Sequence, residues 1–333
     1  MRQQADNRSH GLVPRRGTTA LFLLRRLSLA ALLVFAASSA ALVLAGSAPG
    51  DYATGELGVG ARPEAVAQLR ARYGLDRPVL EQYGRWLANA ARLDFGRSMA
   101  FDRPVADLIP ERAANTALLA VAALVVATAI GLPLGVLTGS QQGGWLLGAL
   151  RTISVLLLSM PPLLTSLGLI FLAARTGWLP IGGMRSIEVA GSGLWDLARH
   201  MAIPVLALAL PLAAMFERFE SGAIREAIAQ PFIRAARARG IPRSRVVWRH
   251  ALKVAARPLL GVYGVAIGSL LSGSFVVEVV TSWPGLGSLM LNALRSRDVF
   301  LVAGCASAGS LFLAAGTLLS DVALAVVDPR SAE

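Results

Sequence analysis

The chain has 333 residues, of which 55% are hydrophobic and only 16% are charged. In soluble domains about a quarter of the residues are charged, so this low charged fraction excludes an ordinary soluble enzyme. Several apolar runs reach the roughly 18 residues that a helix needs to cross a bilayer, which indicates an integral membrane protein. The net charge of +12 would suit nucleic acid, but where the charge lies decides its meaning.

Cysteine and lysine exclude two further classes. The single cysteine, Cys305, excludes a disulfide framework and offers no metal cluster. The one lysine, Lys253, is followed by Val254, so the chain lacks a Walker phosphate loop. We therefore do not expect this chain to be a nucleotide-hydrolysing enzyme.

The first element is a polar, basic tail over residues 1–26, and an apolar run at Leu27–Gly46 follows it. This run is longer than the 7–15 residues typical of a signal-peptide core, so we expect an uncleaved membrane helix. The stretch "SSAALVLAGSA" resembles a cleavage site, which keeps a signal peptide as the alternative.

The next segment, at 47–115, is polar, and its nine arginines are balanced by nine acidic residues. Pro63 and Gly74 bracket one helical pattern, and Pro78 opens a second one. We expect two short helices that lie over the outer mouth of the protein. They would form either a plug on the membrane surface or a docking surface for a partner.

Five further spans are expected in a membrane core at 116–327, before a short closing tail at 328–333. Pro161 and Pro162 should break or kink the second of these five, although a helix bundle can satisfy the freed backbone groups. Together with the first helix they make six spans, and the five lie near Thr116–Leu137, Thr152–Ala174, Met201–Phe216, Leu259–Val280 and Val299–Val327.

Arginine excess sets the expected orientation. The amino-terminal tail is strongly basic, and the segment at 217–258 carries ten basic residues against three acidic ones. Because cytoplasmic segments carry the excess of Lys and Arg, both termini and 217–258 should lie on the cytoplasmic side of the cell membrane, and 47–115 should lie on the outer side. Two termini on the same side require an even number of spans, so six spans fit this orientation and five or seven do not.

The basic segment itself has helical signals. Pro231 suits a first helical turn, and Gly240 suits a C-terminal cap, so we expect a short helix over Phe232–Arg239 and a tight turn after it. Ser244 would cap a second helix leading back to the membrane, and Pro258 would start the fifth span.

Three interpretations of this basic segment compete. Its arginines could bind anionic lipid, or its helix-turn-helix outline could bind nucleic acid. Nucleic acid is disfavoured because the segment lies between membrane spans. We favour a docking helix for a cytoplasmic protein, because small side chains at Ala235, Ala236 and Ala238 admit another backbone and Phe232 and Ile233 would need covering.

"RAARARG" followed by "IPRSRVVWRHALKVAARPLL" resembles the cytoplasmic loop of ABC importer permeases, in which Glu-Ala-Ala precedes a glycine and a later proline. Arg234 stands at the glutamate position, with Gly240 and Pro258 at the later ones. The segments "YGLDRPVLEQYGRWLANAARLDFGRSM", "GWLPIGG" and "FVVEVVTSWPGLGSLMLNALRSRD" also fall in the order of one family. The chain is thus similar to the dipeptide/oligopeptide/nickel permeases, in their first-permease branch.

This resemblance implies an all-α integral membrane protein with the type I ABC importer permease fold. It implies a pore for peptides, or for nickel or another non-peptide solute, built with a second homologous permease, two ABC ATPase subunits and an extracytoplasmic solute-binding protein. ATP and Mg would be bound by the ATPases, with no cofactor in this chain. The residues implied to contact an ATPase are Phe232, Ile233, Arg234, Ala235, Ala236, Arg237 and Gly240.

Polar groups inside spans are candidates for the translocation path, because they are costly there. Glu278, with Ser272 and Ser274 nearby, is the candidate for a gate or substrate contact; the alternative is that Glu278 caps the "SWPGLG" turn. Asp321 is expected to form an interfacial or inter-helix hydrogen bond. Gly131 and Gly135, four residues apart, favour close helix packing.

Two other classes are disfavoured. A self-contained secondary transporter would place more paired charges at mid-membrane, and an intramembrane hydrolase would need a nucleophile and a base at one depth. The histidines His10, His200 and His250 lie outside the confident spans and do not cluster. We therefore expect neither a catalytic residue nor a metal site.

Overall fold

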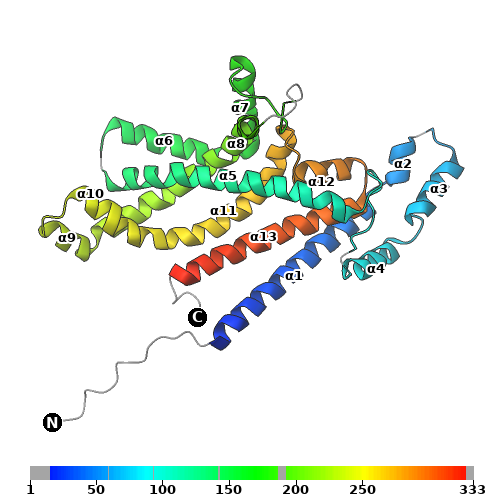
Figure 1. Ribbon diagram of the computed structural model, residues 1–333, viewed down its shortest axis with the longest axis horizontal. Coiled ribbons are helices and arrows are strands. Elements are labelled where there is room, and N and C mark those ends of the chain that lie inside the picture. The colour runs from blue at the N-terminus through cyan, green and yellow to red at the C-terminus, as the bar shows by residue number, and fades with distance from the viewer. Residues whose placement is uncertain (1–15, 59, 93, 142, 187–192, 328–333) are drawn as a thin grey trace, which may run out of the picture.

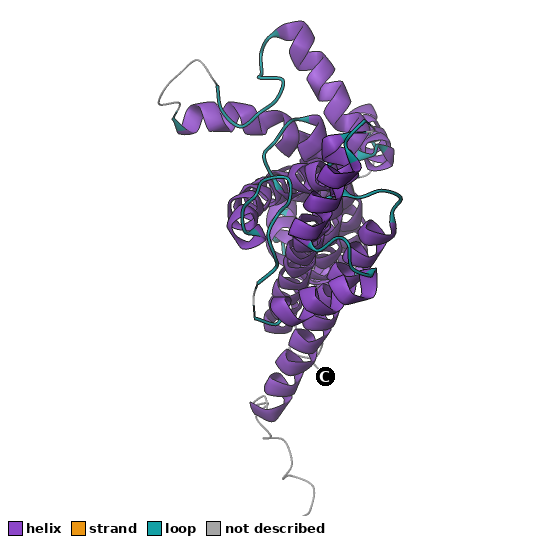
Figure 2. Cartoon of the chain, turned by 90° about the vertical axis from the view of Figure 1, so that its right-hand side faces the viewer, coloured by secondary structure: helices purple, strands orange, loops and turns teal. Residues whose placement is uncertain are grey.

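The structure is a computed structural model that describes residues 16–327 except 59, 93, 142 and 187–192. Within these residues the regular structure is helical, apart from one isolated bridge between Arg97 and Pro104 (Figure 2). The elements are α1 (Arg16–Ser47), α2 (Tyr52–Leu57), α3 (Pro63–Tyr73), α4 (Val79–Ala90), α5 (Val105–Ser140), α6 (Trp145–Ser159), α7 (Pro162–Thr176), α8 (Leu194–Ala229), α9 (Pro231–Ala238), α10 (Arg243–Arg245), the π-helix η1 (Val246–Ala251), α11 (Leu252–Val280), α12 (Leu286–Arg295) and α13 (Val299–Val327).

Among the described residues, five helices are long and apolar enough to cross a membrane, namely α1, α5, α8, α11 and α13. The remaining expected span, the third in chain order, is the pair α6 and α7, which bends by 110° at its break. The bend lies at Pro161 and Pro162, as the sequence predicts, because proline lacks the N–H that a helix interior needs. Thr152–Ala174 is therefore a broken span and not one helix.

The long helices lie along one axis, with α9 and α10 at one end and α2 to α4 at the other (Figure 1). We call these the α9 end and the α4 end. Helices α1 and α13 run side by side, and so do α5 and α8. Segments far apart in sequence are thereby joined into one bundle.

Three expected helix boundaries at the α9 end are wrong. The fourth span was expected to stop at Phe216, but α8 continues to Ala229. Pro258 was expected to separate a short helix from the fifth span, but it lies inside a helix that begins at α10 and runs through η1 into α11. The apolar span within this helix, Gly261–Val280, lies close to the expected one. Pro242 occupies the N-cap that was assigned to Ser244. A proline in a packed membrane helix removes one hydrogen bond without ending the helix.

The tight pair α5 and α8 is built on glycines. A methyl group at Gly131 would lie 2.6 Å from the carbonyl oxygen of Ala213, and one at Gly135 would lie 2.6 Å from Cβ of Glu220. Gly139 continues the same stripe, 2.7 Å from the carbonyl oxygen of Ser221. The predicted packing role of Gly131 and Gly135 is confirmed, since only hydrogen fits between these backbones.

We expect Gly131→Ala to lower the free energy of unfolding by about 1–3 kcal/mol, because the added methyl must push the two backbones apart. Gly168→Ala in α7 is the matched control, since nothing lies within 4 Å of a methyl group there. Thermal unfolding of the two purified variants in the same detergent measures the difference. Equal unfolding temperatures would contradict the packing assignment.

The α4 end confirms both helices that the sequence predicts, with Gly74 in the left-handed conformation at the end of α3. It also adds α2, whose N-cap Asp51 accepts hydrogen bonds from Thr54 N and from Arg70 Nε. Burial alone would raise the pKa of Asp51, but these hydrogen bonds outweigh it and leave the pKa below its ordinary value. The cap is therefore ionised, and its contribution to stability is lost only as the pH falls through that lowered pKa.

A buried aspartate fixes this end to the membrane core. Asp298 caps α13 through Leu301 N at 3.1 Å. Its other oxygen accepts hydrogen bonds from Ser98 Oγ at 2.6 Å and Met99 N at 2.7 Å. One fully buried carboxylate thus holds the segment before α5 against the start of the last span.

Candidate functional site

The helix α9 begins and ends where its sequence requires. Pro231 occupies the first turn after the N-cap Gln230. Gly240 follows the helix with φ +78°, and its N–H donates to the carbonyl oxygen of Arg237 at 2.9 Å. Because a side chain disfavours that conformation, glycine is the suitable residue there. The predicted short helix and turn are confirmed.

One face of α9 is covered by the chain itself. Ile233 is fully buried and Ala236 nearly so, in an apolar cluster with Ile224 of α8 and Val246 and Val247 of η1. The expectation that Ile233 needs a partner to cover it is wrong. These two of the seven implied contact residues hold α9 on the end of the bundle and are not open to a partner.

The opposite face of α9 is open. Phe232 is 46% exposed, and the other exposed residues among the seven are Arg234, Ala235, Arg237 and Gly240. An exposed aromatic ring between arginines and a small side chain is the composition of a protein-binding surface, in which aromatic residues and Arg are enriched. The five exposed residues form what we call the open face of α9.

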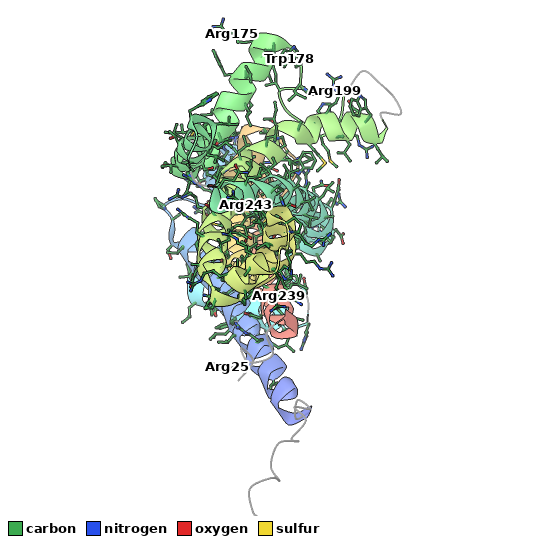
Figure 3. The ribbon with its side chains drawn as sticks, turned by 90° about the vertical axis from the view of Figure 1, so that its left-hand side faces the viewer. Arg25, Arg175, Trp178, Arg199, Arg239 and Arg243 are labelled. Carbon is green, nitrogen blue, oxygen red and sulfur yellow. The ribbon has the colours of Figure 1, made fainter. Side chains whose placement is uncertain are left out.

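The open face is connected rigidly to the spans. Helix α9 follows α8 after a single residue, Gln230. Beyond the turn, Arg243 Nη2 donates to the carbonyl oxygen of Ser140, at the end of α5, at 2.8 Å. Arg239 and Arg243 are labelled on this end of the molecule in Figure 3. A push on α9 would therefore reach α5, α8 and α11 together.

Glu278 is a structural clamp. It is fully buried, and its Oε1 accepts a hydrogen bond from Thr116 Oγ1 at 2.7 Å. Its Oε2 accepts from Gly287 N at 2.6 Å and Ser288 N at 3.4 Å, which caps α12. A methyl group at Gly285 would lie 2.4 Å from the Glu278 carboxylate. These contacts fit the alternative, the capped turn, while the gate or substrate-contact role stays a prediction.

The clamp also joins α5 to the turn between α11 and α12. Thr116 Oγ1 accepts from Leu286 N at 2.8 Å, and Trp283 Nε1 donates to the carbonyl oxygen of Asn115 at 3.1 Å. Asn115 Nδ2 in turn donates to the carbonyl oxygen of Pro284 at 2.8 Å. Sequence reasoning missed these partners, because they lie far apart in the chain.

The two serines proposed with Glu278 do not join it. Ser274 is buried, and its hydroxyl donates to the carbonyl oxygen of Leu271 in its own helix at 3.0 Å. Ser272 is exposed on α11. The structure therefore does not bring Ser272, Ser274 and Glu278 together as one site.

A cleft of about 320 Å³ lies instead at the break between α6 and α7. Besides the break at Pro161 and Pro162, residues of α8 and α11 form the wall of the cleft. Its lining includes Met160, Pro162, Pro211, Met215, Ser269 and Leu270. The proline pair was the sequence signal for this break, but the residues opposite it could not be read from the sequence.

Two buried acidic residues were also missed. Glu217 and Glu220, which were placed in a cytoplasmic loop, are buried on α8 against α5. Thr138 Oγ1 donates a short hydrogen bond to Glu217 Oε1. Within the described part of the chain, neither carboxylate oxygen of Glu220 has a hydrogen-bond partner. Their charges suggested a solvent-exposed segment, but both side chains are buried because the glycines of α5 leave space for them.

Comparison with known proteins identifies the family of the chain. Residues 131–333 match the family described as binding-protein-dependent transport system inner membrane component, and residues 20–120 match the N-terminal region of such membrane components. The chain belongs to this family. It is a membrane permease subunit of an ABC importer and a multi-pass inner membrane protein.

Several relatives of this permease are similar over most of their length. A putative peptide permease protein of Brucella suis is 35% identical over 264 residues, which is 79% of this chain and 82% of the relative. The oligopeptide transport system permease protein AppB of Bacillus subtilis is 30% identical over 313 residues, or 93% and 99%. The glutathione transport system permease protein GsiC of Shigella flexneri is 32% identical over 282 residues, or 84% and 89%.

Proposed function

We propose that this permease and a second, homologous permease form a pore for short peptides. An extracytoplasmic binding protein delivers the peptide, and two ABC ATPase subunits drive transport. The observation that carries the proposal is the open face of α9, held on the bundle by Ile233 and Ala236, in a chain whose relatives include oligopeptide permeases. The named relatives support peptide as the cargo, and the glutathione permease supports a small peptide-like solute as the second candidate.

The proposed orientation places the α9 end in the cytoplasm and the α4 end outside. The arginine excess at 217–258 supports it, because Lys and Arg are retained on the cytoplasmic side. Binding-protein delivery would then take place at α2 to α4, where the segment at 47–115 is balanced in charge. The basic tail before α1 would lie inside.

In the proposed mechanism, α9 is a coupling helix. When the ATPases bind ATP they close on each other, and the open face of α9 moves with the groove that holds it. Rigid-body shifts of this kind convert a change in a partner into a change between inward- and outward-facing states. ATP acts only through its different affinity for the two states, and ATP and Mg are bound by the ATPases and not by this chain.

The proposed path includes the cleft at the α6–α7 break. Its wall combines backbone freed by two prolines with mixed apolar and hydroxyl side chains. Irregular backbone at membrane depth is tolerated where it lines a cavity or is covered by protein. The second permease would cover the apolar surface of α7 and the start of α8, where Phe171, Trp178, Leu194 and Trp195 are all more than half exposed (Figure 3 labels Trp178).

Uptake by a reconstituted complex tests the function. The permease would be co-expressed with a second permease, two ATPases and a binding protein from the same organism, and placed in liposomes. We expect uptake of a labelled peptide to need ATP and the binding protein, and to be competed by peptides of similar length. ATP-independent uptake by the permease alone would favour a self-contained transporter, and competition by a nickel chelate but not by peptide would change the cargo.

A further inference from the structure

A groove of about 420 Å³ runs between α1 and α13, away from the α6–α7 cleft. Both helices are candidate membrane spans, so the groove opens toward the bilayer. Its wall is apolar except for one charged and one hydroxyl side chain, and the hydroxyl of Thr317 donates to the carbonyl oxygen of Leu313 in its own helix at 2.9 Å. The lining residues used below are Arg26, Leu29, Ala30, Leu33, Ala314 and Thr317.

The hollow exists because small side chains face each other across the helix pair. Ala30 lies on α1, and Ala314 and Ala315 lie on α13. The groove extends along α1 from Arg26 to Leu33, about 10 Å at the usual rise of about 1.5 Å per residue. A hollow that is long, narrow and apolar, at membrane depth, suits a hydrocarbon chain and no polar solute.

One end of the groove is positively charged. Arg26 Nη2 forms an ion pair with Asp321 Oδ2 at 2.8 Å, which fixes the guanidinium at the mouth and joins α1 to α13 by an ion pair where a hydrogen bond of Asp321 was expected. Arg25 precedes it on α1; this arginine is exposed and lies outside the groove lining, and it adds a second guanidinium to the same end of the helix (Figure 3). Two arginines against one aspartate leave this end of the helix pair with a net positive charge.

We propose that this groove is a binding site for an anionic phospholipid, with one acyl chain between α1 and α13 and the phosphate on Arg25 and Arg26. Charge complementarity selects this occupant, because each arginine near the surface attracts an anionic headgroup and a zwitterionic headgroup has no net charge to meet. The site rests on the proposed orientation, in which the Arg25 end lies at the cytoplasmic leaflet. A bound lipid would hold α1 on α13.

Native mass spectrometry of the purified permease complex, released from bilayers containing equal amounts of phosphatidylglycerol and phosphatidylcholine, tests the proposal. We expect one phosphatidylglycerol to be retained in preference to phosphatidylcholine. Ala30→Trp, which fills the groove, should remove that lipid. Arg25→Gln combined with Arg26→Gln should lower the preference for phosphatidylglycerol by about tenfold.

Ala36→Trp is the matched control, because Ala36 is exposed on the same helix but does not line the groove, and it should retain the lipid. Equal retention of the two lipids, or retention unchanged by Ala30→Trp, would overturn the proposal. So would cross-linking of Leu29→Cys to the second permease, because a protein would then cover the groove. Lipid retention is read without transport, so its failure is distinguishable from failure of peptide uptake.

Discussion

Replacing Ala235 by tryptophan is expected to reduce ATP-driven uptake at least about tenfold while the permease remains folded in the membrane. Ala235 lies on the open face of α9, where an indole ring would prevent close approach of another backbone. Phe232→Ala should act in the same direction by removing the exposed aromatic contact, since aromatic residues supply much of the binding energy at interfaces. Uptake and ATPase activity of the reconstituted complex are the measurements.

Two controls separate coupling from folding. Leu146→Trp adds a similar ring at an exposed position at the beginning of α6, and it should leave uptake unchanged. Ile233→Ala alters the buried face instead, so it should cost about 2–5 kcal/mol of stability, as a buried truncation does. If Ala235→Trp and Phe232→Ala transported at the normal rate, α9 would not be the coupling helix.

Replacing Glu278 by alanine is expected to destabilise the permease by about 3–5 kcal/mol. The substitution leaves a buried hydroxyl, Thr116 Oγ1, and two backbone N–H groups, those of Gly287 and Ser288, without their shared acceptor. Glu278→Gln keeps one acceptor oxygen and should cost less. Thermal unfolding in detergent should rank Glu278→Ala as the least stable, Glu278→Gln as intermediate and the unaltered chain as the most stable.

The same variants distinguish a clamp from a gate. For a clamp, uptake per folded molecule at a low temperature should stay close to that of the unaltered chain, whereas a gate would lose uptake in a fully folded protein. Ser272→Ala, on the exposed side of α11, is the control and should change stability by no more than about 0.5 kcal/mol. Loss of uptake in stably folded Glu278→Gln would restore the gate assignment.

Local chemistry explains what could be predicted from the sequence. The limits of α9 follow from Pro231 and Gly240, and those of α3 follow from Pro63 and Gly74, because each residue acts on the backbone beside it. The break at Pro161 likewise needs no distant partner. Apolar runs of sufficient length gave five spans and the bent pair α6 and α7 for the same reason.

What could not be predicted depends on distant contacts. Helix α8 was expected to end at Phe216 because charged residues follow, yet Glu217 and Glu220 are buried where the glycine stripe of α5 leaves space. Glu278 resembled a functional intramembrane charge because Thr116, which donates a hydrogen bond to it, lies far away in the chain. Ile233 appeared to need a partner because the residues that cover it come from four other elements, α5, α8, η1 and α11.

The most direct measurement is cross-linking from the open face of α9. Cys305 is the chain's one cysteine and is fully buried, so Phe232→Cys would place a single accessible thiol on that face. In the assembled transporter we predict that this thiol is labelled only from the cytoplasmic side and that its cross-linked product contains a nucleotide-hydrolysing subunit. Labelling from the outside, or cross-linked products that never contain such a subunit, would contradict the account.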